Sequence, residues 1–149
     1  MYQNILVPVD GSETANGGLR EAIGLARALH ARIRLLHVVN TMTWTGDNVA
    51  PAVLEDLVNQ ARSFGECTLH EAKADVRSAG IEVDSRIIEA FGDHAGETIV
   101  AEATSWPAHL IVCGTHGRRG LKRLVLGSDA EYVVRHARVP VLLIRSYEP

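Results

Sequence analysis

Spaced glycines followed by a serine mark the part of the chain best suited to bind an anion. The segment reads Gly114-Thr115-His116-Gly117, and Gly127-Ser128 follows after nine intervening residues. Glycine lets the main chain approach a ligand closely, and successive N–H groups in such a loop form an anion-binding concavity. A helix beginning near Ser128 would add the positive end of its dipole, and the serine hydroxyl can cap that helix and contact a phosphate. This arrangement predicts phosphate binding.

Two widespread phosphate-binding loops are absent. The sequence contains no GxxxxGK[ST] segment, and no GxGxxG follows its first apolar run. The chain therefore lacks both the P-loop and the fingerprint of dinucleotide-binding folds. Any one of the glycines could serve a turn alone. Their spacing, between an apolar run and a helical pattern, favours a nucleotide as the ligand.

Charged side chains within the loop offer further contacts to a phosphate. His116 stands between the first two glycines, and a basic cluster follows that comprises Arg118, Arg119, Lys122 and Arg123. This cluster either steers and holds phosphates or forms a solvated loop face, and we expect its two leading arginines to help the ligand. The histidines and cysteines show neither HExxH nor CxxC spacing, so we expect no metal site built from them.

Short apolar runs predict the strands that position this loop. Such runs are typical of parallel strands buried on both faces, whereas Ile81–Ile88 alternates apolar and polar residues as a strand near an edge does. Pro8 is expected to end the first strand, because proline has no N–H for the ladder. The expected strands are Asn4–Pro8, Ile33–Val39, Ile81–Ile88, Leu110–Cys113 and Val139–Ile144.

Apolar residues at helical spacing predict a helix after each of the first four strands. The first helix follows a cap at Ser12, the second runs from Pro51 to Gly80, and Asp93 caps the third. The last two helices are expected at Ala95–Ser105 and Ser128–His136. The expected apolar stripes are Ala15, Leu19, Ala22, Ile23, Ala26 and Leu29 in the first helix, and Leu57, Ala61, Phe64, Ala72 and Val76 in the second. Alternating strands and helices predict one α/β domain over residues 1–149.

The composition limits the classes of partner. With 149 residues, of which 46% are hydrophobic and 22% charged, the chain fits one domain with a buried core. Its net charge of −3 argues against general nucleic-acid binding. No apolar run reaches the roughly 20 residues that span a bilayer, so we expect no membrane segment. Cys67 and Cys113 are far apart in sequence, which suits a reducing cytoplasm.

The loop and several other segments together resemble the universal stress protein family. Gly114-x2-Gly117-x9-Gly127-Ser128 is similar to the nucleotide-binding signature of the members that bind ATP. The opening Ile5–Ser12, the tripeptide Leu36-His37-Val38 and the closing Val139–Leu143 also look like this family. The resemblance covers essentially the whole chain. It implies an open five-stranded parallel sheet in the order 3-2-1-4-5 with helices on both faces, a Rossmann-like fold akin to the adenine nucleotide α-hydrolases.

This strand order would bring Asp10, after the first strand, opposite Gly114, after the fourth, where ligands of open α/β sheets bind. By similarity, Asp10 would accept hydrogen bonds from the ribose hydroxyls. The residues implied for the adenine pocket are Pro8, Val9 and Val38, with Cys113 at its edge. The residues implied for the phosphates are Gly114, Gly117, Gly127 and Ser128.

Three of the polar residues have a second interpretation. Asp10 can instead cap the helix that follows it, although its position at a strand end favours the ribose. Ser12 is favoured as a helix cap over a phosphate ligand. Asp129 stands where many members of the family have a small apolar residue. Its carboxylate would be unfavourable beside a triphosphate unless it points away or binds a metal.

The resemblance favours an ATP-binding stress-response protein that acts as a nucleotide-dependent regulatory or interaction module. Mg²⁺ is expected with the triphosphate. No acid–base pair is recognisable, so catalysis is not expected beyond slow ATP hydrolysis. The alternatives are a slow ATPase and an interaction protein with an unused nucleotide site. The protein partner is unknown.

An edge strand predicts how two copies would assemble. The apolar run Val139–Ile144 would lie at the edge of the sheet, where an uncovered strand invites aggregation. Pairing with the same strand of a second subunit would give a homodimer. A loop that covers the edge is the alternative.

Overall fold

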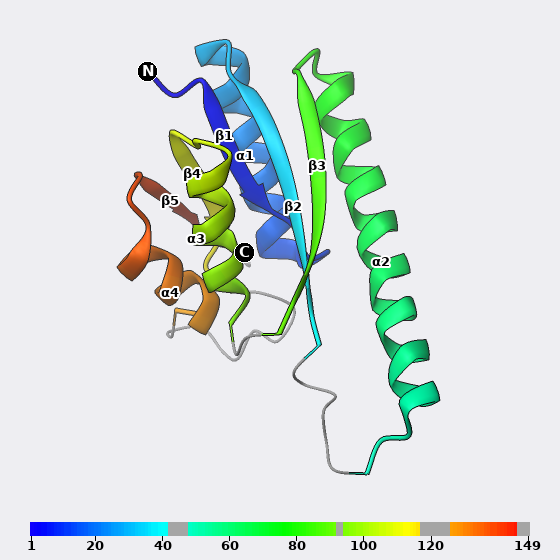
Figure 1. Ribbon diagram of the computed structural model, residues 1–149. Helices are drawn as coiled ribbons and strands as arrows, with labels where there is room; N and C mark the ends of the chain where they lie inside the picture. Colours follow the sequence, from blue (N-terminus) through cyan, green and yellow to red (C-terminus); the bar gives the residue numbers. More distant parts are fainter. Residues whose placement is uncertain (42–47, 92–93, 117–125, 146–149) are drawn as a thin grey trace.

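One parallel sheet forms the centre of the computed structural model (Figure 1), which describes residues 1–41, 48–91, 94–116 and 126–145. Its strands lie in the order β3-β2-β1-β4-β5, and each neighbouring pair is parallel. This confirms the predicted order and both predicted edge strands. The strands are β1 (Asn4–Pro8), β2 (Arg32–Asn40), β3 (Val83–Ala90), β4 (Leu110–Gly114) and β5 (Val141–Ile144).

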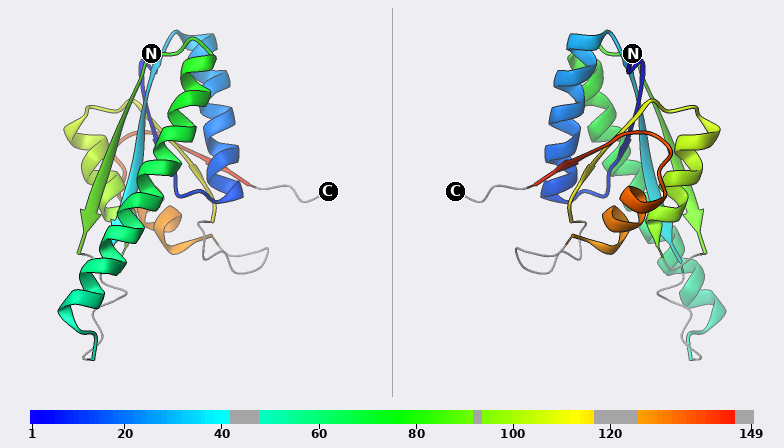
Figure 2. Two further views of the ribbon diagram at one scale, coloured as in Figure 1. Left: turned by 90° about the vertical axis from the view of Figure 1, so that its right-hand side faces the viewer. Right: turned by 90° about the vertical axis from the view of Figure 1, so that its left-hand side faces the viewer.

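Helices cover both faces of the sheet, as the two side views in Figure 2 show. The helices are α1 (Glu13–Leu29), α2 (Pro51–Ser78), α3 (Ala95–Ser105) and α4 (Ser128–His136). Helices α1 and α2 pack on the face that contains Val7 and Leu35, and α3 and α4 pack on the face that contains Leu6 and Leu36. The bounds of α3 and α4 match the predicted ones.

Local sequence explains where several elements begin and end. Strand β1 ends at Pro8, as predicted. The hydroxyl oxygen of Ser12 accepts a hydrogen bond from the main-chain N–H of Ala15 at 3.2 Å, which confirms Ser12 as the cap of α1. Pro51 opens α2, and Gly80 follows its end with a left-handed φ of 75°.

Strands β3 and β5 both begin two residues later than predicted. The main-chain N–H of Ile81 donates to the carbonyl of Val76 at 3.3 Å, so this residue still belongs to the turn that closes α2. Strand β5 begins after Pro140, whose nitrogen cannot donate to the ladder. In both places the apolar pattern begins before the strand does, because residues that close a turn can also be apolar.

The caps of α3 and α4 differ from the predicted ones. Gly127 is the cap residue of α4 and Ser128 is its first helical residue, so the prediction that Ser128 caps this helix is wrong. Asp93 lies outside the described residues. The cap position of α3 is His94, whose side chain makes no capping bond. Instead, the Asp129 carboxylate from α4 accepts a hydrogen bond from Gly96 N–H at 3.0 Å.

The residues of the predicted apolar stripes are buried only where their helix packs against the sheet. Leu29 and Phe64 are 41% and 42% exposed, because Leu29 ends α1 and the ring of Phe64 reaches toward Gly11 at the end of the sheet. The residues that α2 buries are Gly65, Leu69, Ala72 and Val76. Figure 1 shows why, since the first half of α2 extends beyond the sheet.

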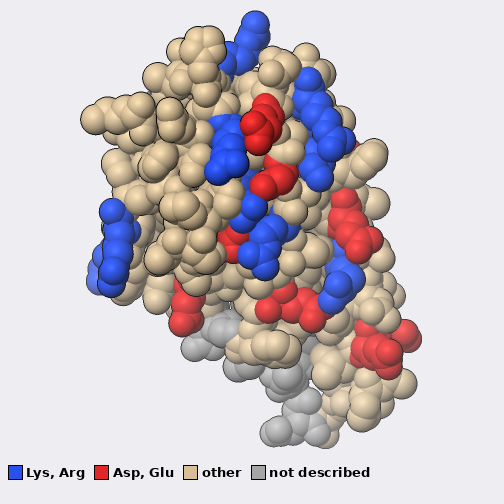
Figure 3. Space-filling model, turned by 45° about the horizontal axis from the view of Figure 1, so that its top comes forward, with Lys and Arg blue, Asp and Glu red and all other residues tan. Residues whose placement is uncertain are grey.

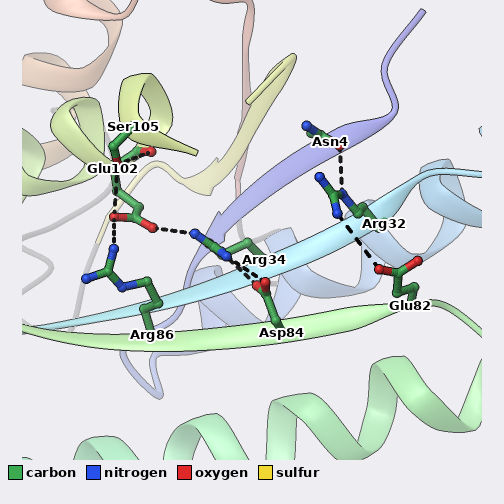
Figure 4. A network of polar contacts seen from close by, with 8 residues as sticks. All are labelled: Asn4, Arg32, Arg34, Glu82, Asp84, Arg86, Glu102 and Ser105. Atoms are coloured by element: carbon green, nitrogen blue, oxygen red, sulfur yellow. Dashed lines mark hydrogen bonds and ion pairs between the residues drawn. The ribbon is translucent and has the colours of Figure 1, made fainter. Parts of the chain in front are cut away.

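A buried carboxylate joins α3 to the β2–β3 edge (Figure 4). Glu102 is 3% exposed and accepts hydrogen bonds from Arg34 at 2.9 Å and Arg86 at 3.0 Å. The Arg34 guanidinium also donates to both oxygens of Asp84, which lowers the pKa of that carboxyl. The Trp106 ring lies 4.7 Å below the same guanidinium. Acidic and basic side chains are intermixed over part of this face of the molecule (Figure 3), which includes the ion pairs of this network.

Candidate functional site

The direction of winding reverses between β1 and β4, which lie side by side in the middle of the sheet. Their register pairs Ile5 with Leu110 and Leu6 with Ile111. The carboxyl ends of both strands therefore lie at the same edge of the sheet, and ligands of open α/β sheets bind at such a reversal. Pro8 and Gly114 are the last residues of the two strands, so the sequence-predicted halves of the site meet here.

A tight turn connects β1 to α1. A carboxylate oxygen of Asp10 accepts a hydrogen bond from the main-chain N–H of Ser12 at 2.9 Å. Gly11 between them has a φ of 81°, a conformation that favours glycine. The Phe64 ring from α2 closes over this glycine, since a Cβ atom there would lie 3.1 Å from it. The capping role weighed for Asp10 is thus filled by Ser12, while Asp10 orders the turn.

Thr14 connects α1 to the beginning of the glycine loop. It is buried, and its hydroxyl donates to the main-chain carbonyl of His116. The hydroxyl oxygens of Ser12 and Thr14 lie 3.3 Å apart, and Thr115 Oγ1 lies 3.0 Å from His116 Nδ1. Sequence reasoning missed Thr14. The signal that could have found it is its place four residues before Gly18, on the helix face that packs against β4.

The end of β4 lies directly against the first turns of α1. A Cβ atom on Gly114 would come within 2.8 Å of both the carbonyl carbon and the Cβ of Thr14. A Cβ atom on Gly18 would meet the main chain of Cys113 and Gly114 at 3.5 Å. Gly114 is therefore required by the packing of α1 on β4, whatever it contributes to a ligand.

A main-chain hydrogen bond joins the two ends of the glycine loop. Gly127 N–H donates to the Thr115 carbonyl at 2.8 Å, and a Cβ atom on this glycine would lie 3.0 Å from the same oxygen. Thr115 N–H in turn donates to Ile144 in β5 at 2.9 Å. We call these joined ends, Thr115–His116 and Gly127, the loop neck. Gly117, Arg118, Arg119, Lys122 and Arg123 lie outside the described residues, so their contacts with phosphate remain predictions.

The residues implied for the adenine pocket divide between the two faces of the sheet. Val38 and Cys113 share the face covered by α3 and α4, and Pro8 faces the same way as Leu6 by strand alternation. Val9 is buried on the opposite face. The main-chain groups of Val9 are also engaged, because its N–H donates to Leu36 at 2.9 Å and its carbonyl lies 2.8 Å from His37 Nδ1. Three of the four residues implied for the adenine pocket, Pro8, Val38 and Cys113, thus lie on one face of the sheet, and Val9 does not.

His37 and Cys113 are both buried side chains. His37 is buried and satisfied by the Val9 carbonyl. Burial raises the pKa of the Cys113 thiol to about 12, so it remains neutral and unreactive near neutral pH.

The first turn of α4 has one exposed hydroxyl and one engaged carboxylate. Ser128 is exposed at the amino end of this helix, beside the loop neck. Asp129 contacts α3, and a Cβ atom on Gly96 would lie 2.7 Å from the Asp129 carbonyl oxygen. The Asp129 carboxylate is therefore explained by its bond to Gly96. Among the described residues, no three His, Cys, Asp or Glu side chains gather as a metal site.

A cleft lies at the end of the strands opposite to Pro8 and Gly114. This cleft of about 660 Å³ is lined in part by Arg27, His30, Ala79 and Glu82. The carboxyl ends of α1 and α2 reach it, and helix carboxyl ends carry a partial negative charge that disfavours phosphate. The amino ends of α1 and α4 lie instead at the carboxyl edge of the sheet, where their partial positive charge would favour an anion. Within the described ranges, no helix is long and apolar enough to span a bilayer.

Comparison with known proteins agrees with this geometry. The universal stress protein family matches residues 1–145 of the chain. A universal stress protein of Methanocaldococcus jannaschii is 32% identical over 145 residues, covering 97% of this chain and 83% of that protein. The structure of universal stress protein UspA from Lactobacillus plantarum is 30% identical with a TM-score of 0.83, covering 97% of this chain and 98% of the other.

A nucleotide complex is among the similar structures. The universal stress protein from Archaeoglobus fulgidus in complex with dAMP is 25% identical with a TM-score of 0.66, and the match covers 96% of this chain and 98% of that one. These similarities in structure agree with the fold described above. The chain belongs to the universal stress protein family.

Proposed function

We propose that this chain binds ATP at the carboxyl edge of the sheet, between β1 and β4, with the phosphates at the loop neck and the amino end of α4. The observation that carries the proposal is the bond from Gly127 N–H to the Thr115 carbonyl. It brings the end of β4 and the first turn of α4 together at the reversal of strand order. The dAMP complex of the Archaeoglobus fulgidus relative supports an adenine nucleotide as the ligand.

The remaining contacts follow from the placement of the described side chains. Asp10 would accept hydrogen bonds from the ribose, and Pro8, Val38 and Cys113 would contact adenine on their shared face. Val9, whose side chain is buried on the opposite face of the sheet, would not contact adenine but would hold the end of β1 in place. Ser128 and the glycines would hold the phosphates. Mg²⁺ would be held chiefly by the phosphates and water, as is usual for this ion with nucleotides.

Binding, rather than turnover, is the activity that we propose. Hydrolysis needs a group that orients water and charge that stabilises the γ-phosphate. Asp129 is engaged with α3, which removes one candidate from the reaction. The bound nucleotide would instead change the surface around the loop neck and so regulate contact with a protein partner in the cytoplasm.

A homodimer through β5 is part of this proposal. The carbonyls of Pro140 and Ile144 accept hydrogen bonds from the N–H groups of Ile111 and Thr115. By alternation, the main-chain groups of Val141 and Leu143 therefore face away from the sheet. A second β5 would pair with these groups. Analytical ultracentrifugation should find a dimer at micromolar concentration, and a monomer there would refute the dimer.

Ligand release tests the proposed nucleotide. Protein purified without added nucleotide is denatured, and the small molecules released are identified by mass spectrometry. We expect ATP or its breakdown products in the wild type and much less in Gly117→Asp, whose carboxylate would repel phosphate. A turnover assay on the same two proteins should show no hydrolysis that distinguishes them. A released ligand that contains no adenine would refute the proposal.

A further inference from the structure

Within the loop neck, the main-chain carbonyls of Thr115 and His116 both accept hydrogen bonds from residues distant in sequence. The Thr115 carbonyl accepts from Gly127 N–H, and the His116 carbonyl accepts from the Thr14 hydroxyl. Carbonyl oxygens carry partial negative charge and repel phosphate, whereas main-chain N–H groups attract it. An anion site therefore binds phosphate more tightly when its carbonyl oxygens accept hydrogen bonds from other groups and point away from the phosphate. Gly127 is part of the glycine signature, but Thr14 is not.

Thr14 is firmly placed to hold its carbonyl. It is 7% exposed in the first turn of α1, and Gly114 leaves no room for a Cβ atom against it. The hydroxyl bond spans 102 positions of sequence, so it ties the segment after β4 to the segment after β1. Without the hydroxyl, the His116 carbonyl would need another donor, and rotation of its peptide group would be the easiest way to find one.

We propose that Thr14 is a positioning residue for the nucleotide phosphates, because its hydroxyl holds the His116 carbonyl away from them. This role rests on the proposed function, and Thr14 is not among the residues that the sequence predicted for the site. Thr14 acts through His116 and has no direct contact with the ligand. It therefore sets the affinity for the phosphates and leaves the affinity for the nucleoside unchanged.

The test compares ATP with adenosine on substituted proteins by isothermal titration calorimetry. Thr14→Val keeps the shape of the side chain and removes its donor, and Thr14→Ser keeps the donor. The matched control is Thr104→Val in α3, where the hydroxyl donates to the Val100 carbonyl at 3.1 Å. We expect Thr14→Val to bind ATP about tenfold more weakly than the wild type, which corresponds to the loss of one satisfied polar group. Thr14→Ser and Thr104→Val should bind ATP like the wild type.

Adenosine separates positioning from general damage. We expect adenosine to bind Thr14→Val as it binds the wild type. Equal ATP binding by Thr14→Val and wild type would overturn the role, as would an equal loss for ATP and adenosine. If Thr14→Val does not fold, Thr14→Ala takes its place with the same expected difference between the two ligands. A wild type that binds adenosine but gains nothing from phosphates would also refute it, whereas one that binds neither ligand would refute the proposed function itself.

Discussion

Gly127 donates its main-chain N–H to the carbonyl oxygen of Thr115 at 2.8 Å, and this bond closes the glycine loop at its base. The bond places the amino end of α4 beside the end of β4. A hydrogen bond that holds the two ends of the loop together lowers the cost of ordering them when a ligand binds. The glycine signature therefore serves the fold and the proposed ligand together.

Gly114→Ala should destabilise the protein. Its Cβ atom would lie 2.8 Å from the carbonyl carbon and the Cβ of Thr14. Because the nearest atoms include main chain, α1 would have to move, at a cost of about 1–3 kcal/mol in the free energy of unfolding. Urea unfolding followed by circular dichroism measures this difference.

Gly24→Ala is the matched control, because a Cβ atom there would meet nothing within 4 Å. It lies within α1, where alanine favours the helix by up to about 1 kcal/mol. We expect a small stabilisation. If the two alanine variants unfold at the same urea concentration, the close packing of α1 on β4 is contradicted.

Asp129→Ala should weaken the fold but not nucleotide binding. It removes the acceptor for Gly96 N–H and so the side-chain cap of α3, which is worth about 1 kcal/mol. Thermal unfolding would show the loss, and calorimetry with ATP and Mg²⁺ would show unchanged affinity. A marked loss of Mg²⁺-dependent ATP binding would mean that Asp129 binds the metal instead.

Glu102→Ala should be costly because it leaves two arginines without their shared acceptor. Glu102 is buried, but Arg86 is half-exposed and Arg34 keeps Asp84. We therefore expect a loss of about 2 kcal/mol, less than for a fully buried pair. Glu97→Ala, on the exposed side of α3, is the control in the same unfolding assay and should change stability little. Equal effects would show that the buried network adds nothing.

The ion pair of Asp84 with Arg34 should make the stability of the fold depend on pH in the acid range. Hydrogen bonding from Arg34 lowers its pKa below the ordinary value of 3.8. A lowered folded-state pKa means that the pair stabilises the fold above that ordinary value, and that the contribution is lost as the pH falls through the lower folded-state pKa. The effect is modest because Asp84 is half-exposed. The melting temperatures of wild type and Asp84→Asn should differ at neutral pH and converge in strong acid. A gap that widens in acid would contradict this.

Much of the fold could be predicted because its determinants are local. The apolar runs identified each strand, Pro8 ended the first, and Ser12 capped α1. The strand order came from the family resemblance. Local periodicity could not distinguish a strand from the turn before it, which is why Ile81 was placed in β3 although its N–H closes α2.

The candidate site was predictable only in part. The glycines could be recognised by spacing, but the partner of a polar side chain depends on which helix face meets which strand. The bond from Thr14 to His116 and the bond from Gly96 to Asp129 both join segments that are distant in sequence. Val9 was assigned to the adenine pocket by resemblance, and only the packed sheet shows that its side chain is buried on the opposite face.

Equilibrium binding of ATP to the purified protein tests the central claim most directly. Isothermal titration calorimetry with ATP, after bound ligand has been removed, should give a dissociation constant of about micromolar order, or about −8 kcal/mol. Gly117→Asp should weaken that binding. Heats with ATP indistinguishable from those of buffer, for a protein whose circular dichroism shows it folded, would contradict the account.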